Sequence, residues 1–191
     1  MASSSSDSPV FSSELDSHQQ QTLSCFYPSS SAIPQISSSA SAPPEVQSFI
    51  RDLASAANKV ANANACGSLL AGQGSESDDF GDVGVWLGEG ELGRGHEEDA
   101  LKALGLQSWA GSGKICVDEL QRETCLPLTF KPSSSTAEVQ TLTELLSRLQ
   151  DKVYFYVERG SGEVAHFLLG KLSVGTVSGW AGLAGIGITS D

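Results

Sequence analysis

A glycine-rich stretch resembles a site for phosphate binding. Gly88, Gly90 and Gly93 match the G-x-G-x-x-G pattern, in which small residues let the backbone approach a pyrophosphate. Glu89 and Glu91 stand between these glycines, where the negatively charged phosphates would have to lie. The flanking sequence also lacks the strand–helix–strand alternation of a dinucleotide-binding domain. We therefore interpret this stretch as an acidic loop.

A second stretch, residues 111–114, reads Gly-Ser-Gly-Lys and resembles the end of a P-loop. Position 108 is Ser, where that motif needs a glycine, and Ile115 stands where a Ser or Thr would bind Mg²⁺. The stretch more simply predicts a turn before a strand.

Residues for nucleophilic or metal chemistry are sparse. The sequence has no G-x-S-x-G motif, and its histidines are His18, His96 and His166. Its four cysteines form no C-x-x-C pair and have no histidine at a metal-ligand spacing. We expect His166 to be a partly buried structural imidazole, although a Cys116–His166 pair stays open. The prediction is a protein that is not an enzyme and has neither a cofactor nor a metal of its own.

The acidic charge is local. The chain has 23 acidic and 11 basic residues and a net charge of -12, which argues against direct binding to nucleic acid or to an anionic membrane. Residues 75–99 carry nine acids against Arg94 alone, two-thirds of the net charge. A solvated loop explains this cluster, and so does a surface that offers carboxylates to a basic or metal-containing site on a partner.

Compartment signals are weak. The sequence has no secretory signal and no apolar run near the ~20 residues that cross a bilayer. Free thiols favour a reducing interior, so we expect the cytoplasm or nucleus. A chloroplast is the alternative, because the start Met-Ala-Ser-Ser resembles a transit peptide. Against import, residues 1–42 lack Lys and Arg and contain three acids.

The chain divides into a leader and one domain. Residues 1–42 are Ser-rich with unperiodic apolar positions, which predicts disorder. Residues 43–191 form the predicted domain. Apolar spacing and turn residues predict these elements: a helix over 45–61, strands over 80–87 and 114–117, a short helix over 97–104, a Leu-rich helix over 137–149, a hairpin of 153–158 and 163–172, and a strand over 180–188. This order predicts an α+β fold with an antiparallel sheet.

Several short motifs follow one another along the domain in an order that resembles a known family. The first half of the domain carries Gly67-Ser68-Leu69-Leu70, then Ser75-Glu76-Ser77-Asp78-Asp79-Phe80, then Val83-x-Val85-Trp86. The second half carries the Leu-rich helix, Val153-Tyr154, the hairpin strand over 164–170 and Ala181-Gly182-Leu183. Together these motifs resemble the nuclease A inhibitor family over about residues 45–191.

The resemblance implies an α/β/α sandwich similar to the pathogenesis-related-1 (PR-1-like) arrangement. It also implies a monomer that plugs the active site of a Mg²⁺-dependent, non-specific DNA/RNA nuclease of the ββα-metal type. In that family the Glu of Ser-Glu-Ser and the last residue of the chain reach the catalytic region. These correspond here to Glu76 and to Asp191, which would approach the partner's metal.

The expected partner-binding residues are Ser75, Glu76, Ser77, Asp78, Asp79, Asp82 and Asp191. The alternative function is a regulatory protein-interaction domain on the same scaffold whose partner is not a nuclease.

Overall fold

A six-stranded sheet forms the centre of the computed structural model, which describes residues 10–12, 14–29, 42–134 and 136–189. The strands are β1 (Val10–Phe11), β2 (Val83–Gly88), β3 (Lys114–Asp118), β4 (Gln150–Glu158), β5 (Glu163–Val174) and β6 (Val177–Ile188). Their order is β1-β2-β6-β5-β4-β3, and every neighbouring pair is antiparallel. The described residues thus confirm the predicted α+β class and its antiparallel sheet.

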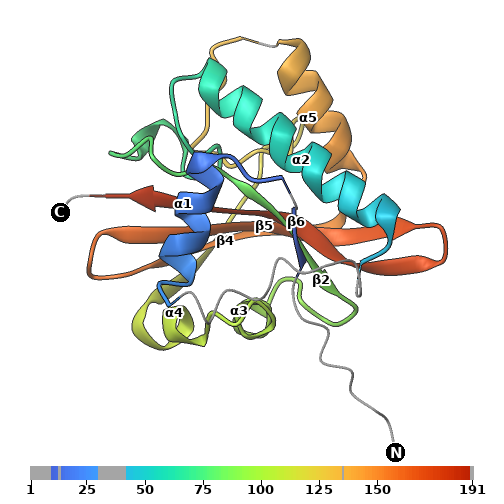
Figure 1. The fold of residues 1–191 in the computed structure, drawn as a ribbon. Coiled ribbons are helices and arrows are strands. Elements are labelled where there is room, and N and C mark those ends of the chain that lie inside the picture. Colours follow the sequence, from blue (N-terminus) through green and yellow to red (C-terminus); the bar gives the residue numbers. More distant parts are fainter. Residues whose placement is uncertain (1–9, 13, 30–41, 135, 190–191) are drawn as a thin grey trace, which may run out of the picture.

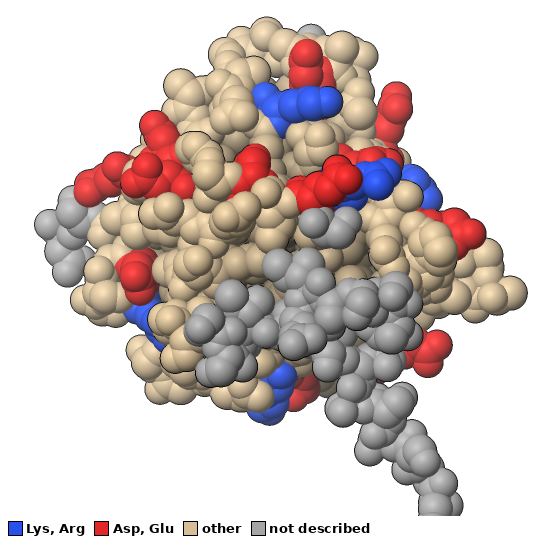
Figure 2. All heavy atoms as spheres, viewed as in Figure 1, with Lys and Arg blue, Asp and Glu red and all other residues tan. Residues whose placement is uncertain are grey.

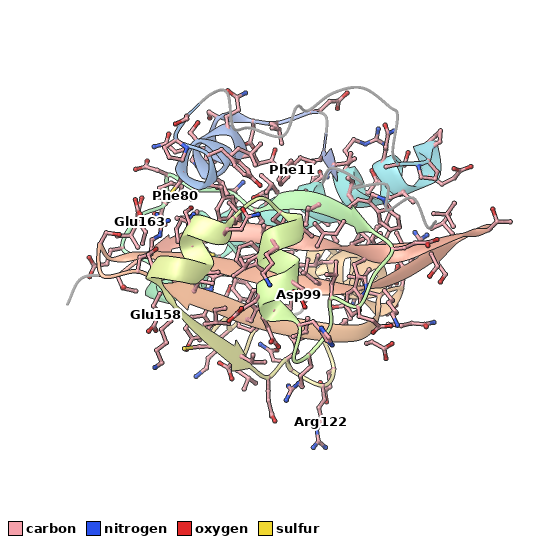
Figure 3. All side chains as sticks on the ribbon, turned by 90° about the horizontal axis from the view of Figure 1, so that it is seen from below. Phe11, Phe80, Asp99, Arg122, Glu158 and Glu163 are labelled. Atoms are coloured by element: carbon pink, nitrogen blue, oxygen red, sulfur yellow. The ribbon has the colours of Figure 1, made fainter. Side chains whose placement is uncertain are left out.

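Helices lie on both faces of this sheet (Figures 1 and 3). The helices are α1 (Ser17–Phe26), α2 (Pro44–Ala63), α3 (Glu97–Ala103), α4 (Gln107–Ser112) and α5 (Ala137–Ser147), with a 3₁₀ turn η1 (Gly72–Gly74). One apolar core lies between the sheet and α2 with α5, and a second lies between the sheet and α1, α3 and α4. We call the first the α2 face and the second the α1 face.

The predicted periodicities account for both cores. In α2 the buried residues include Val46, Phe49, Ile50 and Leu53, which lie on one side because they recur every three or four positions. Along β2, Val83, Val85 and Leu87 point to the α1 face, whereas Trp86 points to the α2 face. The predicted hairpin is β4 and β5, and the predicted last strand is β6. The sequence did not predict the short helix α4.

The prediction of a disordered leader is wrong for residues 10–12 and 14–29. Val10 pairs with Trp86, so β1 extends the sheet beyond β2. Asp16 caps α1 through a capping box with Gln19. The ring of Phe26 stacks on Phe167 with 5.7 Å between centroids. The rest of the predicted leader, apart from Ala42, lies outside the described residues.

Candidate functional site

The acidic loop (residues 75–79) follows η1 and leads towards β2. Glu76, Asp78 and Asp79 are exposed, and Ser75 and Ser77 are half-buried. Ser77 Oγ donates a hydrogen bond to the Asp79 carboxylate at 3.2 Å, and Asp79 N–H donates to Ser77 Oγ at 3.2 Å. Figure 2 shows acidic side chains gathered at the upper left of the view, where Figure 1 places this loop. The structure thus presents three of the predicted carboxylates to solvent on one short segment.

The end of β6 holds this loop in place. Glu76 N–H donates a hydrogen bond to Ile188 O at 2.9 Å, and Ile188 N–H donates to Ser75 Oγ at 3.1 Å. Ser75 Oγ also donates to Ser77 O at 3.0 Å, which closes the turn. Two segments more than 110 residues apart in the chain therefore form one edge of the molecule (Figure 1).

Helix α1 contacts the loop and the following Gly81 through hydrogen bonds of its backbone and side chains. His18 Nδ1 lies 2.9 Å from Asp78 O and must donate to it, because a carbonyl oxygen only accepts. Gly81 N–H donates to His18 O at 3.1 Å, and Thr22 Oγ1 donates to Gly81 O at 2.6 Å. The segment that composition assigned to a disordered leader therefore helps to position the candidate site.

The prediction that Asp82 contacts a partner is wrong, because its side chain is fully buried. The carboxylate accepts hydrogen bonds from Ser68 Oγ and Leu69 N–H, both at 2.6 Å, and from Leu70 N–H at 3.5 Å. Burial raises the pKa of the Asp82 carboxyl to about 6, and these three hydrogen bonds oppose that rise. A side chain at Gly185 would collide with the carboxylate. Asp82 is thus part of the scaffold beneath the loop.

Asp82 also joins the helices to this scaffold through its backbone. Its carbonyl accepts hydrogen bonds from Gln19 Nε2 and from Asn58 Nδ2, each at 2.9 Å, and its N–H donates to Asn58 Oδ1 at 2.9 Å. One residue therefore connects α1, α2, the turn at residues 68–70 and β6. The remaining predicted contact, Asp191, lies outside the described residues.

The glycine-rich loop has a packing role. Gly90 O accepts a hydrogen bond from Trp180 Nε1 at 2.8 Å, and Gly93 lies so close to the same indole that a Cβ would stand 2.8 Å from it. Leu92 is buried in the core of the α1 face. The next helix, α3, begins with three acidic residues, which would repel a phosphate. The described geometry therefore supports the interpretation of this stretch as a loop.

A cavity of about 510 Å³ opens beside the acidic loop, and Ser75 belongs to both. Its floor is the end of the α2 face, where Tyr154 and Tyr156 of β4 lie beside His166 of β5. We call it the tyrosine pocket. Sequence reasoning named Tyr154 only within a motif of the family resemblance and assigned neither tyrosine to a site. The predicted strands, 153–158 and 163–172, leave a four-residue turn that would place Ala165 opposite Tyr156. The observed register instead pairs Glu158 with Val164, which places His166 opposite Tyr156.

Within this pocket, His166 is a partly buried imidazole, as the sequence predicted. Tyr154 O–H donates to Leu70 O at 3.1 Å, and its oxygen lies 2.9 Å from His166 Nδ1. Since the phenol has one proton, Nδ1 must be the donor in the second contact, which leaves Nε2 unprotonated. Burial lowers the pKa of the His166 imidazole to about 4, so the ring is neutral at physiological pH.

The open question of a Cys116–His166 pair is settled by the strand order. Cys116 of β3 and His166 of β5 both lie opposite Tyr156 of β4, so the tyrosine stands between them. Within the described part of the chain the four cysteines are free thiols, and no cluster of His, Cys, Asp or Glu could hold a metal ion. In the same residues, no helix is both long and apolar enough to span a bilayer.

No model of a known protein family matches the chain, and no curated protein matches it.

Proposed function

We propose that this protein is a non-enzymatic, inhibitor-like binding protein that inserts the acidic loop into the active site of a Mg²⁺-dependent, non-specific DNA/RNA nuclease. The observation that carries the proposal is the hydrogen bond from Glu76 N–H to Ile188 O at 2.9 Å. This bond joins the loop that contains Glu76 to β6, the strand that precedes Asp191 in the sequence. Glu76 and Asp191 correspond to the two contact positions of the nuclease A inhibitor family. One edge of the molecule can therefore carry both segments to one site on a partner.

The charge of this edge suits a groove that binds phosphate. Glu76, Asp78 and Asp79 project from a loop whose backbone is held by β6 and α1. A pre-ordered loop loses little conformational freedom on binding, and carboxylates can occupy the positions of substrate phosphates beside basic side chains. Charge complementarity of this kind accelerates association and weakens as salt screens it.

The proposal includes the finer assignments that go with it. The scaffold would be the α/β/α sandwich of the nuclease A inhibitor family in its pathogenesis-related-1 arrangement. The protein would act as a monomer in the cytoplasm or nucleus, with the chloroplast as the alternative, and would use no cofactor. It would contact neither nucleic acid nor membrane directly, and Asp191 would approach the metal of the nuclease.

A titration tests the proposal. The full chain is added to a Mg²⁺-dependent non-specific nuclease of the ββα-metal type, and DNA cleavage is measured at low and at high salt. We expect stoichiometric inhibition that is stronger at low salt. Glu76→Lys should weaken it by about 3 kcal/mol, the scale of an interface hot spot. Glu144→Lys on α5 makes the same charge change at another exposed position and should leave inhibition intact.

The alternative is a regulatory interaction domain that uses the same edge on a partner that is not a nuclease. Absence of inhibition at both salt concentrations would favour this alternative. Equal inhibition by the wild type and by Glu76→Lys would refute the assignment of the acidic loop as the contact site.

A further inference from the structure

The tyrosine pocket lies on the part of the α2 face that the helices leave open. Leu168 of β5 and Leu183 of β6 are buried beneath α2 and α5. Further along, Tyr156 and His166 are only partly covered. Residues outside the strands, including Ser75, Leu128 and Thr129, complete the lining. At about 510 Å³ the cavity falls within the range of roughly 300–1,000 Å³ that ligand pockets span.

The rim of the pocket is negatively charged. Asp118 at the end of β3 and Glu158 at the end of β4 both line it, and among the described residues of the lining Lys131 is the one Lys or Arg. Figure 3 shows Glu158 at the end of the sheet where β4 finishes. The pKa of the Tyr156 phenol is raised by burial and by Cys116, and then by these two carboxylates. The negative charge of Asp118 and Glu158 is therefore felt at the Tyr156 phenol, on the floor of the pocket.

The floor offers acceptors and ring faces. His166 Nε2 is unprotonated, as the hydrogen bonds of Tyr154 require, and it lies over Gly187, where a Cβ would stand 3.1 Å from it. None of the described residues hydrogen-bonds to Nε2. The Tyr156 ring lies against the imidazole, with centroids 5.7 Å apart and planes at 34°. A ligand that matches this floor needs N–H donors, a positive charge and a flat shape.

A guanidinium group has all three properties. It is planar, carries five N–H donors and a permanent charge, and stacks on aromatic rings. The aliphatic stem of an arginine would meet apolar wall residues such as Leu128, whose side chain is exposed. A carboxylate or phosphate would instead face Asp118, Glu158 and the lone pair of the imidazole. The chemistry of the pocket therefore selects a cation.

We propose that the tyrosine pocket binds the guanidinium of an arginine side chain on the protein partner, beside the contact made by the acidic loop. The identity of the partner that carries this arginine rests on the proposed function. The pocket lies directly beside the acidic loop, since Ser75 belongs to both. Arginine is among the residues most enriched at interface hot spots, and a pocket next to a charged loop would fix the orientation of the complex.

The first test uses a small probe and no partner. N-acetyl-arginine amide is titrated into the ¹⁵N-labelled full chain, and amide shifts are followed at Ser75, Thr129, Tyr156, His166 and Gly187. N-acetyl-citrulline amide is the matched control, since it keeps the shape and loses the charge. We expect saturable shifts with arginine and an affinity about tenfold lower or worse with citrulline. Equal affinities, or no saturable shift with arginine, would overturn the proposal.

Variants test the three parts of the pocket. Tyr156→Leu removes the ring and should weaken arginine binding about tenfold, whereas Tyr156→Phe keeps the ring and should bind nearly as the wild type does. The double change Asp118→Asn with Glu158→Gln should also weaken binding about tenfold, because the attractive charge is lost. Lys131→Gln should strengthen it. Weaker binding by Lys131→Gln would show that the pocket prefers anions and would refute the proposal.

A nuclease titration separates this proposal from the proposed function. If the arginine probe binds but the nuclease is not inhibited, the pocket stands and the inhibitor function falls. If the nuclease is inhibited equally by the wild type and Tyr156→Leu, and the probe does not bind, the pocket falls and the inhibitor function stands. Unchanged dispersion of the amide spectrum confirms that each variant is folded.

Discussion

The Ser75 hydroxyl accepts a hydrogen bond from Ile188 N–H at 3.1 Å, and this contact joins the acidic loop to the last strand of the sheet. The same oxygen donates to Ser77 O at 3.0 Å. A single hydroxyl therefore sets the turn of the loop and its distance from β6. The geometry of the candidate site depends on this pairing between residues that are distant in the sequence.

Ser75→Ala should loosen the acidic loop while leaving the sheet intact. Removing the hydroxyl breaks both contacts, at a cost of about 1 kcal/mol in unfolding free energy, and should increase amide exchange at Glu76 and Ile188. Ser173→Ala at an exposed position near the end of β5 is the control. Unchanged exchange at Glu76 would contradict the role of Ser75.

Asp82→Ala should destabilise the fold by about 2 kcal/mol or more, because it leaves the Ser68 hydroxyl and the Leu69 N–H buried without an acceptor. Urea unfolding measures the change. Asp79→Ala, at an exposed position in the acidic loop, should stay close to the wild type in stability. If Asp82→Ala unfolds like Asp79→Ala, Asp82 is not the scaffold residue that the hydrogen bonds indicate.

Asp82 should also affect the pH dependence of stability. Its pKa is raised from 3.8 to about 6 in the folded state, so the folded protein binds the proton more tightly. The stabilisation from this proton is fully present below pH 3.8 and is lost as the pH rises through about 6. In Asp82→Asn this loss between pH 4 and 6 should disappear. Unfolding free energies of both proteins across that range provide the comparison.

His166 should have the opposite effect over a similar range. Its pKa is lowered from 6.5 to about 4 by burial, so the unfolded chain binds the proton more tightly. The stabilisation from the neutral ring is present above pH 6.5 and is lost as the pH falls through about 4. His166→Gln should therefore be less sensitive to acid than the wild type. Equal sensitivity would mean that His166 is not held neutral by burial.

Helix α1 should be required for stability. Phe26→Ala should lower the unfolding free energy by about 3 kcal/mol, because the ring stacks on Phe167 and packs edge-on against Trp109. Leu128→Ala is the matched apolar control, since its side chain is 48% exposed and should cost little. A small effect of Phe26→Ala would contradict this role of α1 in stability.

The sequence could not reveal α1, for a physical reason. Two of the buried positions of the helix are Gln19 and Thr22, whose polar groups donate to backbone carbonyls of the segment before β2. Because the buried face of α1 is partly polar, its sequence shows no apolar period. The composition of this segment therefore resembles that of a disordered chain. Only the partners supplied by the folded domain make this helix stable.

Local pattern determined the main helices and strands from α2 to β6, with the short helix α4 as the exception, because a helix or a strand buries one face at a fixed spacing. It also determined that the carboxylates of the acidic loop would gather in one segment. The tertiary structure decided which of those carboxylates can reach a partner. Asp82 follows Asp79 closely in the sequence, yet it is buried against Gly185 while Asp79 is exposed. Such differences depend on contacts between distant segments, which charge and spacing along the chain do not specify.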